Sequence, residues 1–196
     1  MHKKRNVGIF IFNGAEVLDF AGPFEVFSVA SEANQCSLFE VFTVSEKSAA
    51  VLAINGLSVN PTYNFSNCPP IDILIISGGA GSKAMMDDKG TLNWIDQTHQ
   101  KSEYTLSICS GARFLGKLGL LDGRPYCTHA EVYEQMKEIV PTGLPQQHQR
   151  FAQAGKLYTS GGITAGMDLS FHLLEKLLGR EIATKTATYM EYKRTS

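Results

Sequence analysis

The sequence lacks long hydrophobic runs and an excess of charge of one sign. The apolar run closest to its start, Val7–Phe12, is closed by Asn13-Gly14. That is too short for a signal peptide or for the roughly 18 residues of a membrane span. Lysine and arginine number 18 against 19 aspartates and glutamates, a net charge of -1. We therefore expect no membrane contact and no basic surface that binds nucleic acid directly.

Cysteine is scarce, and its spacing is uninformative. Cys36, Cys68, Cys109 and Cys127 form no C-x-x-C pair, which argues against a metal site or a disulfide framework. We expect reduced thiols and a cytoplasmic protein. A chain of 196 residues can bury an adequate hydrophobic core without disulfide bonds or a structural metal. We expect one domain over residues 1–196.

Short apolar runs alternate with helical patterns along the chain. The expected strands are residues 7–12, 38–44, 71–76 and 104–108, with hairpins within 51–60 and 150–159. The expected helices are residues 23–30, 92–100, 111–118, 132–139, 169–178 and 182–192, with Pro23 in a first turn. This β-α alternation predicts an α/β fold with a mostly parallel sheet between two helical layers.

Cys109 stands where an apolar strand meets a helix start rich in small residues, Ser107–Ala112. A sharp strand-to-helix turn would lift its side chain out of the sheet and aim backbone N–H groups at the sulfur. Such a turn would lower the pKa of the thiol and offer an oxyanion site. The alternative is a buried small apolar residue, because free cysteine is among the most buried residue types. For the other three cysteines, that alternative is favoured.

Asp19 is a carboxylate among apolar residues in the first connection between strand and helix. Loops at the carboxyl ends of parallel strands form the ligand crevice, so Asp19 and Cys109 can both face it. Alternatively, Asp19 caps the helix that begins at Pro23. The glycines of Ser77–Gly81 let the backbone approach a ligand, although a tight turn alone needs them too. His129 is either a partner for the thiol or a packed histidine near a strand end.

Together these segments resemble the ThiJ/PfpI superfamily, whose fold is shared with class I glutamine amidotransferases. The resemblance rests on Leu18–Pro23, Ser77–Gly81, Ser107–Ala112, Thr128-His129 and Gly161–Asp168, and it covers nearly the whole chain. It is most similar to the isocyanide hydratase branch, and the same segments resemble the sensory domain of certain AraC-type regulators. The resemblance implies a flavodoxin-like, doubly wound α/β domain and a homodimer.

The resemblance also assigns roles to residues. The nucleophile falls on Cys109, its acidic partner on Asp19, and the oxyanion donors on the backbone of Gly79 and Ser110. Ser110 stands where the hydratase branch typically has threonine, and it keeps the hydroxyl.

Further substrate contacts are implied at Ile163 and Thr164. The branch relies on the carboxylate, so His129 remains an alternative partner. Ala130 stands where family hydratases commonly have an aromatic residue, which changes the shape expected for the pocket.

The function implied is a cysteine-dependent lyase that converts a small electrophile, an isonitrile, into an N-substituted formamide. No cofactor or metal is expected. Glyoxalase-like or amidase chemistry is the alternative within enzymes. A ligand sensor acting through a partner protein is the alternative outside them, because no helix-turn-helix segment follows before Ser196. A redox sensor is a further alternative, because an exposed thiol of low pKa oxidises readily.

Overall fold

A seven-stranded sheet forms the centre of the molecule. The structure is a computed structural model that describes residues 3–35 and 37–194. The strand order is β10-β11-β7-β6-β1-β2-β5, and every neighbouring pair is parallel except β10 and β11. The strands are β1 (Arg5–Phe10), β2 (Phe39–Ser45), β5 (Tyr63–Asn64), β6 (Ile73–Ile76), β7 (Tyr104–Ser107), β10 (Phe151–Ala154) and β11 (Leu157–Ser160). The mostly parallel sheet is confirmed.

The central strands are buried because their sequences are apolar on both faces. Val7, Ile9 and Phe10 of β1 are fully buried, as is every residue of β6. Continuous apolar strands of this kind are typical of a parallel sheet that is covered by helices on both sides.

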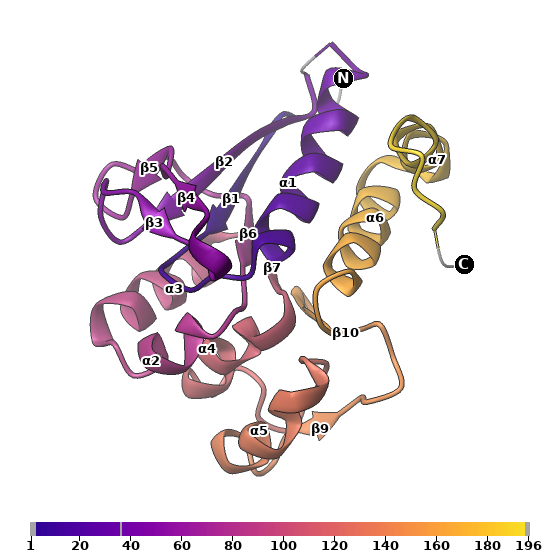
Figure 1. The fold of residues 1–196 in the computed structure, drawn as a ribbon. Helices are drawn as coiled ribbons and strands as arrows, with labels where there is room; N and C mark the ends of the chain where they lie inside the picture. Colours follow the sequence, from indigo (N-terminus) through magenta and orange to yellow (C-terminus); the bar gives the residue numbers. More distant parts are fainter. Residues whose placement is uncertain (1–2, 36, 195–196) are drawn as a thin grey trace.

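Helices cover both faces of this sheet. Figure 1 shows α1 and α6 on one side, with α7 beyond them, and α3 and α4 on the other. The helices are α1 (Val17–Glu32), α2 (Gly81–Met85), α3 (Lys89–Lys101), α4 (Ala112–Lys117), α5 (Tyr133–Ile139), α6 (Ala165–Leu178) and α7 (Arg180–Tyr189). The arrangement is flavodoxin-like, as expected. Within residues 3–35 and 37–194, no helix is long and apolar enough to cross a membrane.

Two hairpins lie where the sequence predicts them. β3 (Val51–Leu52) pairs antiparallel with β4 (Ser58–Val59), and β10 pairs with β11. Within the first hairpin, Asn55 and Gly56 have φ values of 59° and 83°, the left-handed conformation that these residue types tolerate. β8 (Pro125–Tyr126) and β9 (Leu144–Pro145) form a further, parallel pair that was not predicted.

The first helix begins earlier than predicted. α1 starts at Val17, so Pro23 lies inside the helix and not in its first turn. Since proline has no N–H, the helical hydrogen bond from residue 23 to the carbonyl of Asp19 is missing. α6 likewise begins at Ala165, ahead of the predicted residue 169, because its first turn consists of small residues without a clear apolar period.

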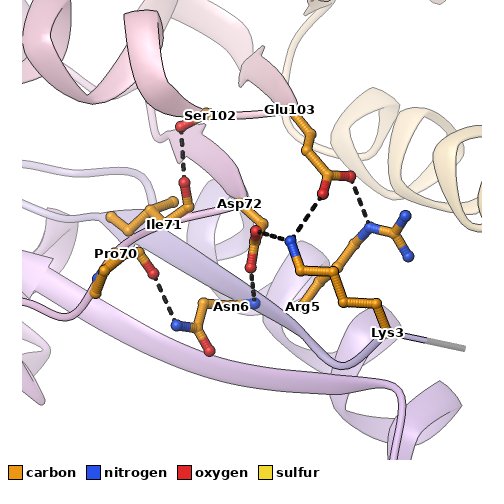
Figure 2. A network of polar contacts seen from close by, with 8 residues as sticks. All are labelled: Lys3, Arg5, Asn6, Pro70, Ile71, Asp72, Ser102 and Glu103. Carbon is orange, nitrogen blue, oxygen red and sulfur yellow. Dashed lines mark hydrogen bonds and ion pairs between the residues drawn. The ribbon is translucent and has the colours of Figure 1, made fainter.

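The amino-terminal ends of β1, β6 and β7 are joined by a polar network (Figure 2). Lys3 Nζ lies 2.7 Å from Asp72 Oδ1 and 3.1 Å from Glu103 Oε1. Arg5 Nε donates to Glu103 Oε2 at 2.8 Å, and the Asn6 N–H donates to Asp72 Oδ2 at 2.9 Å. Hydrogen bonds and charge from these partners hold the pKa values of both carboxyl groups below their ordinary values.

Candidate functional site

Cys109 lies in the sharp turn that the sequence predicts. β7 ends at Ser107, and a 3-10 turn over Cys109–Gly111 leads directly into α4. Cys109 has a φ of 56°, the left-handed conformation that is uncommon for residues other than glycine. Its N–H donates to the Gly161 carbonyl at 3.2 Å, and its carbonyl accepts from Thr128 Oγ1 at 2.9 Å. The turn therefore holds the cysteine at the carboxyl end of the central sheet.

Asp19 meets Cys109 from α1. Its side chain is fully buried, and Oδ2 accepts from the Gly78 N–H at 3.1 Å. The Cys109 thiol and the Ile163 N–H also act on the carboxyl group and lower its pKa. Within the described residues, Oδ1 itself has no hydrogen-bond partner at an acceptable distance and angle. The alternative that Asp19 caps a helix is wrong. The residue preceding α1 is Glu16, and Asp19 lies within its first turn.

Gly78 has to be a glycine for this contact to form. A Cβ at this position would lie 2.6 Å from the Ser110 nitrogen and 2.8 Å from Asp19 Oδ2. The Gly78 carbonyl accepts from the Glu16 N–H at 2.9 Å, so both of its backbone polar groups bind the first helix. The glycine-rich loop thus fixes Asp19 relative to Cys109.

Burial dominates the electrostatics of this pair. Desolvation raises the pKa of Asp19 to about 7, although the Gly78 N–H and the Cys109 thiol act in the opposite direction. Burial and the Asp19 charge raise the pKa of Cys109 to about 12, although the N–H groups of Ser110 and Ile163 act in the opposite direction. The expectation that the pKa of this thiol falls is therefore wrong, because burial and Asp19 outweigh the backbone amides. Between these two values the pair retains one proton, and that proton belongs to both groups.

Ser110 and Gly79 are bonded to each other. The Gly79 N–H donates to Ser110 Oγ at 2.8 Å, and Ser82 Oγ lies 3.2 Å from the same hydroxyl. Of the two expected oxyanion donors, the Ser110 N–H acts on the Cys109 sulfur. The Gly79 N–H is already engaged by the Ser110 side chain.

The remaining expected residues divide into two groups. Ile163 has a φ of 49°, and its N–H acts on both Asp19 and Cys109. Thr164 Oγ1 instead accepts from Arg150 Nη2 at 3.0 Å, and Thr164 does not line the cavity beside Cys109.

His129 lies beside the site without joining the pair. Its Nδ1 accepts from the Glu131 N–H at 3.3 Å. Its ring packs so closely on Gly162 that a Cβ there would lie 2.3 Å from Cδ2. In the part of the chain that the structure describes, His129 has no hydrogen bond to Cys109 or Asp19.

A cavity of about 330 Å³ opens beside the thiol. It is lined by Glu16, Gly79, Ala80, Lys83, Cys109, Ser110, Arg113, His129, Glu131, Val132 and Ile163. This volume is typical of a pocket for a small molecule. A cavity of about 760 Å³ lies elsewhere, against β10, α6 and α7, and contains none of the expected site residues.

Arg113 is the residue of this cavity that the sequence analysis missed. It lies on α4 one helical turn after Cys109 and is 8% exposed. Nη1 donates to Ser82 Oγ at 2.7 Å and Nε donates to Gln135 Oε1 at 2.8 Å. Burial lowers the pKa of its guanidinium. A charged residue four positions after the cysteine, among apolar neighbours, was the available signal.

Of the other cysteines, Cys127 is buried and Cys68 is half-buried, and burial raises the pKa of each thiol to about 11. Neither lines the cavity beside Cys109, and Cys36 lies outside the described residues. Among residues 3–35 and 37–194, no group of three or more histidine, cysteine, aspartate or glutamate side chains could hold a metal ion.

Known proteins share both the sequence pattern and the fold. The isonitrile hydratase of Pseudomonas putida is 32% identical over 187 residues, which is 95% of this chain and 78% of that protein. The HTH-type transcriptional regulator GbdR of Pseudomonas aeruginosa is 25% identical over 190 residues, or 97% of this chain. The chain spans only 51% of that regulator's length.

Solved structures show the same fold. A ThiJ/PfpI family protein from Pseudomonas syringae superposes with a TM-score of 0.86 at 24% identity, covering 98% of this chain and 77% of that one. Drosophila melanogaster DJ-1beta superposes with a TM-score of 0.81 at 18% identity, covering 97% and 99%. The DJ-1/PfpI family model matches residues 5–176. The resemblance inferred from the motifs is therefore confirmed, and the chain belongs to the DJ-1/PfpI family.

Proposed function

We propose that this protein is a cysteine-dependent hydratase that adds water to a small electrophile, with an isonitrile as substrate and an N-substituted formamide as product. The contact between the buried Asp19 carboxyl and the Cys109 thiol carries the proposal. It puts a nucleophile and a proton carrier beside a cavity of about 330 Å³. The similarity to an isonitrile hydratase supports the choice of substrate.

In the first step, the Cys109 sulfur attacks the terminal carbon of the isonitrile. The S–C bond forms, and the thiol proton passes through Asp19 to that carbon, giving a thioimidate. A pKa of about 7 suits Asp19 to this transfer, because a proton carrier works best near the ambient pH. The N–H groups of Ser110 and Ile163 act on the sulfur, where they stabilise its negative charge.

In the second step, water attacks the thioimidate carbon while Asp19 takes a proton from the water and returns it to the nitrogen. The tetrahedral adduct then collapses, the C–S bond breaks, and the sulfur regains a proton as the carbonyl forms. The sum is one isonitrile plus one water giving one formamide. If the Ser110 side chain turns away from Gly79, the Gly79 N–H becomes a second donor to the oxygen.

The test is formamide production from alkyl and aryl isonitriles by the purified protein, beside Cys109→Ala. A methylglyoxal assay and an amide hydrolysis assay run in parallel. Cysteine-dependent turnover of isonitriles alone supports the proposal. Turnover of methylglyoxal or amides alone would assign the alternative chemistry, and equal activity of wild type and Cys109→Ala would contradict a nucleophilic cysteine.

A ligand-sensing role is the second candidate, and the regulator GbdR favours it because its similarity covers 97% of this chain. A sensor would bind a small molecule beside Cys109 without turning it over. Binding measured by calorimetry, with no product formed by the wild type, is the result that would favour it. The raised pKa of Cys109 weighs against a redox sensor, since the thiolate is the form that oxidises.

The proposal extends to the oligomeric state of the protein and to its cellular compartment. We expect a homodimer, as the family resemblance implies, and light scattering on the purified protein tests this. A nucleophilic Cys109 has to be reduced to act, so we expect the protein to work in a reducing compartment such as the cytoplasm.

A further inference from the structure

A buried arginine without an anionic partner lies in the cavity beside Cys109. Arg113 is 8% exposed, and its hydrogen bonds go to Ser82 and Gln135, which are both neutral. Across residues 3–35 and 37–194, no carboxylate lies within ion-pair distance of its guanidinium. Buried charges are normally paired, because desolvation of an unpaired charge is costly.

Nearby carboxylates do not supply the missing charge. Glu16 and Glu131 line the same cavity, but neither forms an ion pair with Arg113. The Asp19 carboxyl binds Gly78 and Cys109 instead. Only when the Cys109 thiol is ionised does its negative charge act to raise the pKa of the Arg113 guanidinium.

The hydrogen bonds of Arg113 leave one edge of its guanidinium available. Nε and one hydrogen of Nη1 are occupied, whereas Nη2 makes no hydrogen bond to any described residue. A guanidinium fixed on two sides offers its remaining N–H groups in a planar fork, which matches a carboxylate or a similar oxyanion. Because Arg113 and Cys109 line the same cavity, such an anion would lie beside the reacting sulfur.

We propose that Arg113 binds an anionic group of the substrate, so that the protein acts on small electrophiles that carry a carboxylate. This inference rests on the proposed function and narrows its substrate class to isocyano-carboxylates. The anion binds Arg113 while Cys109 attacks the isocyano carbon of the same molecule. A competing role is that Arg113 only balances the charge of the Cys109 and Asp19 pair.

Alkylation of Cys109 tests the anion site without any assumption about turnover. Iodoacetate and iodoacetamide both form an S–C bond with the thiolate and expel iodide, but only iodoacetate carries a carboxylate. Because both reagents attack the same thiolate, a change in the pKa of Cys109 cancels in the ratio of their rates. We expect Arg113→Met to lower the iodoacetate-to-iodoacetamide ratio roughly tenfold.

Lys83→Met is the matched control. Lys83 is an exposed cation that lines the same cavity, and solvent screens its charge, so the ratio should change less than about threefold. Arg113→Lys keeps the charge without the planar fork and should give an intermediate ratio. An unchanged ratio in folded Arg113→Met, or an equal fall in Lys83→Met, would overturn the inference.

A measurement on the wild type guards against variants that fail to fold. Acetate and propionate should slow the alkylation of Cys109 by iodoacetamide, whereas acetamide and propionamide at equal concentration should not. Equal protection by acids and amides would overturn the anion site.

Turnover then separates this inference from the proposed function. Isocyanoacetate should be hydrated with a higher kcat/KM than its methyl ester, and Arg113→Met should remove the difference mainly through KM. An equal fall in kcat for both substrates would assign Arg113 to charge balance and overturn the inference. No turnover of any isonitrile, with the alkylation preference intact, would contradict the proposed function and leave the anion site supported.

Discussion

At the amino-terminal ends of β1, β6 and β7, carboxylates and cations lie in direct contact. At the carboxyl ends, the Asp19 carboxyl and the Arg113 guanidinium are both buried, and they form no ion pair with each other. Hydrogen bonds and charge from Lys3 and Arg5 lower the pKa values of Asp72 and Glu103. Burial raises the pKa of Asp19 instead. The same residue type is thus held ionised at one end of the sheet and pushed toward its neutral form at the other.

The difference lies in solvent and partners. Asp72 and Glu103 keep 23% and 35% of their side-chain surface exposed and have cations within 3.1 Å, an arrangement that adds little to stability. Asp19 is fully buried, and no cation among the described residues forms an ion pair with it. Natural proteins break the rule that buried charges are paired mainly at functional sites. The contrast supports our proposal that the reaction takes place at the carboxyl end of the sheet, which we call its chemical end.

The largest effect should come from removing the thiol at the chemical end. Cys109→Ala should lower isonitrile turnover by at least about 10⁴-fold, because Cys109 is the only thiol among the described residues that line the cavity. Cys68→Ala, which removes a half-buried thiol ahead of β6, should leave the rate close to that of the wild type. Steady-state formamide production measures both. Comparable losses in the two variants would mean that the comparison between the ends is mistaken.

Replacing the buried carboxyl with an amide should have the next largest effect. Asp19→Asn keeps the acceptor for the Gly78 N–H but cannot carry a proton, so kcat should fall by roughly 10²–10⁴-fold. Because the Asp19 charge raises the pKa of Cys109, alkylation of Cys109 should shift to lower pH in this variant. Rates of turnover and of iodoacetamide labelling against pH measure the two effects. A shift of labelling to higher pH would show that Asp19 accepts the thiol proton.

The dependence of stability on pH should have opposite signs at the two ends. The pKa of Asp19 rises from 3.8 to about 7 on folding, so its contribution is fully present below 3.8 and is lost as pH rises toward 7. Asp19 by itself should lower the free energy of unfolding by up to about 1.4 kcal/mol per pH unit in that window. Asp19→Asn should remove this slope and raise the melting temperature at pH 8.

Asp72→Asn is the matched variant. Since folding lowers the pKa of Asp72, its contribution is present above the unfolded value and is lost as pH falls. This variant should lower the free energy of unfolding at pH 7 by about 0.2–1 kcal/mol. Denaturant titrations at several pH values compare the two variants. Slopes of the same sign would contradict the contrast between the ends.

The smallest effect should come from the hydroxyl beside the thiol. Ser110→Ala removes the acceptor of the Gly79 N–H but keeps the backbone N–H that acts on Cys109. A neutral hydrogen bond contributes about 0.5–1.5 kcal/mol, so turnover should change by about tenfold or less. Kinetics beside Cys109→Ala measure the difference. Abolished turnover in folded Ser110→Ala would give the hydroxyl a direct part in the reaction.

Local sequence predicts much of this molecule because its strands are apolar on both faces. The bounds of β1, β6 and β7 lie within two residues of the predicted bounds at each end. The turn at Cys109 was predicted from small residues, and its φ of 56° confirms the sharp change of direction. Two-residue strands such as β8 and β9 carry no such pattern, because their identity depends on pairing with distant segments.

The electrostatics of the site depend on tertiary burial, which local sequence does not encode. The pKa of Cys109 was expected to fall because of the helix start, yet burial of the thiol and the charge of Asp19 raise it. Asp19 looked like a helix cap because Pro23 suits a first turn, but α1 begins at Val17 without a side-chain cap. Arg113 has apolar neighbours in the sequence, but its burial depends on tertiary contacts such as those with Ser82 and Gln135.

The order of the strands bears on how the site forms while the chain is being synthesised. Cys109 is made before Ile163, whose N–H acts on its sulfur, and the two residues are 54 positions apart. At the usual 5–20 residues per second, the ribosome needs roughly 3–11 seconds to make that interval. During this time the surroundings that raise the pKa of the Cys109 thiol are incomplete, because β10, β11 and Ile163 do not yet exist. We therefore expect the thiol of the growing chain to be more accessible to oxidants and electrophiles than the thiol of the folded protein.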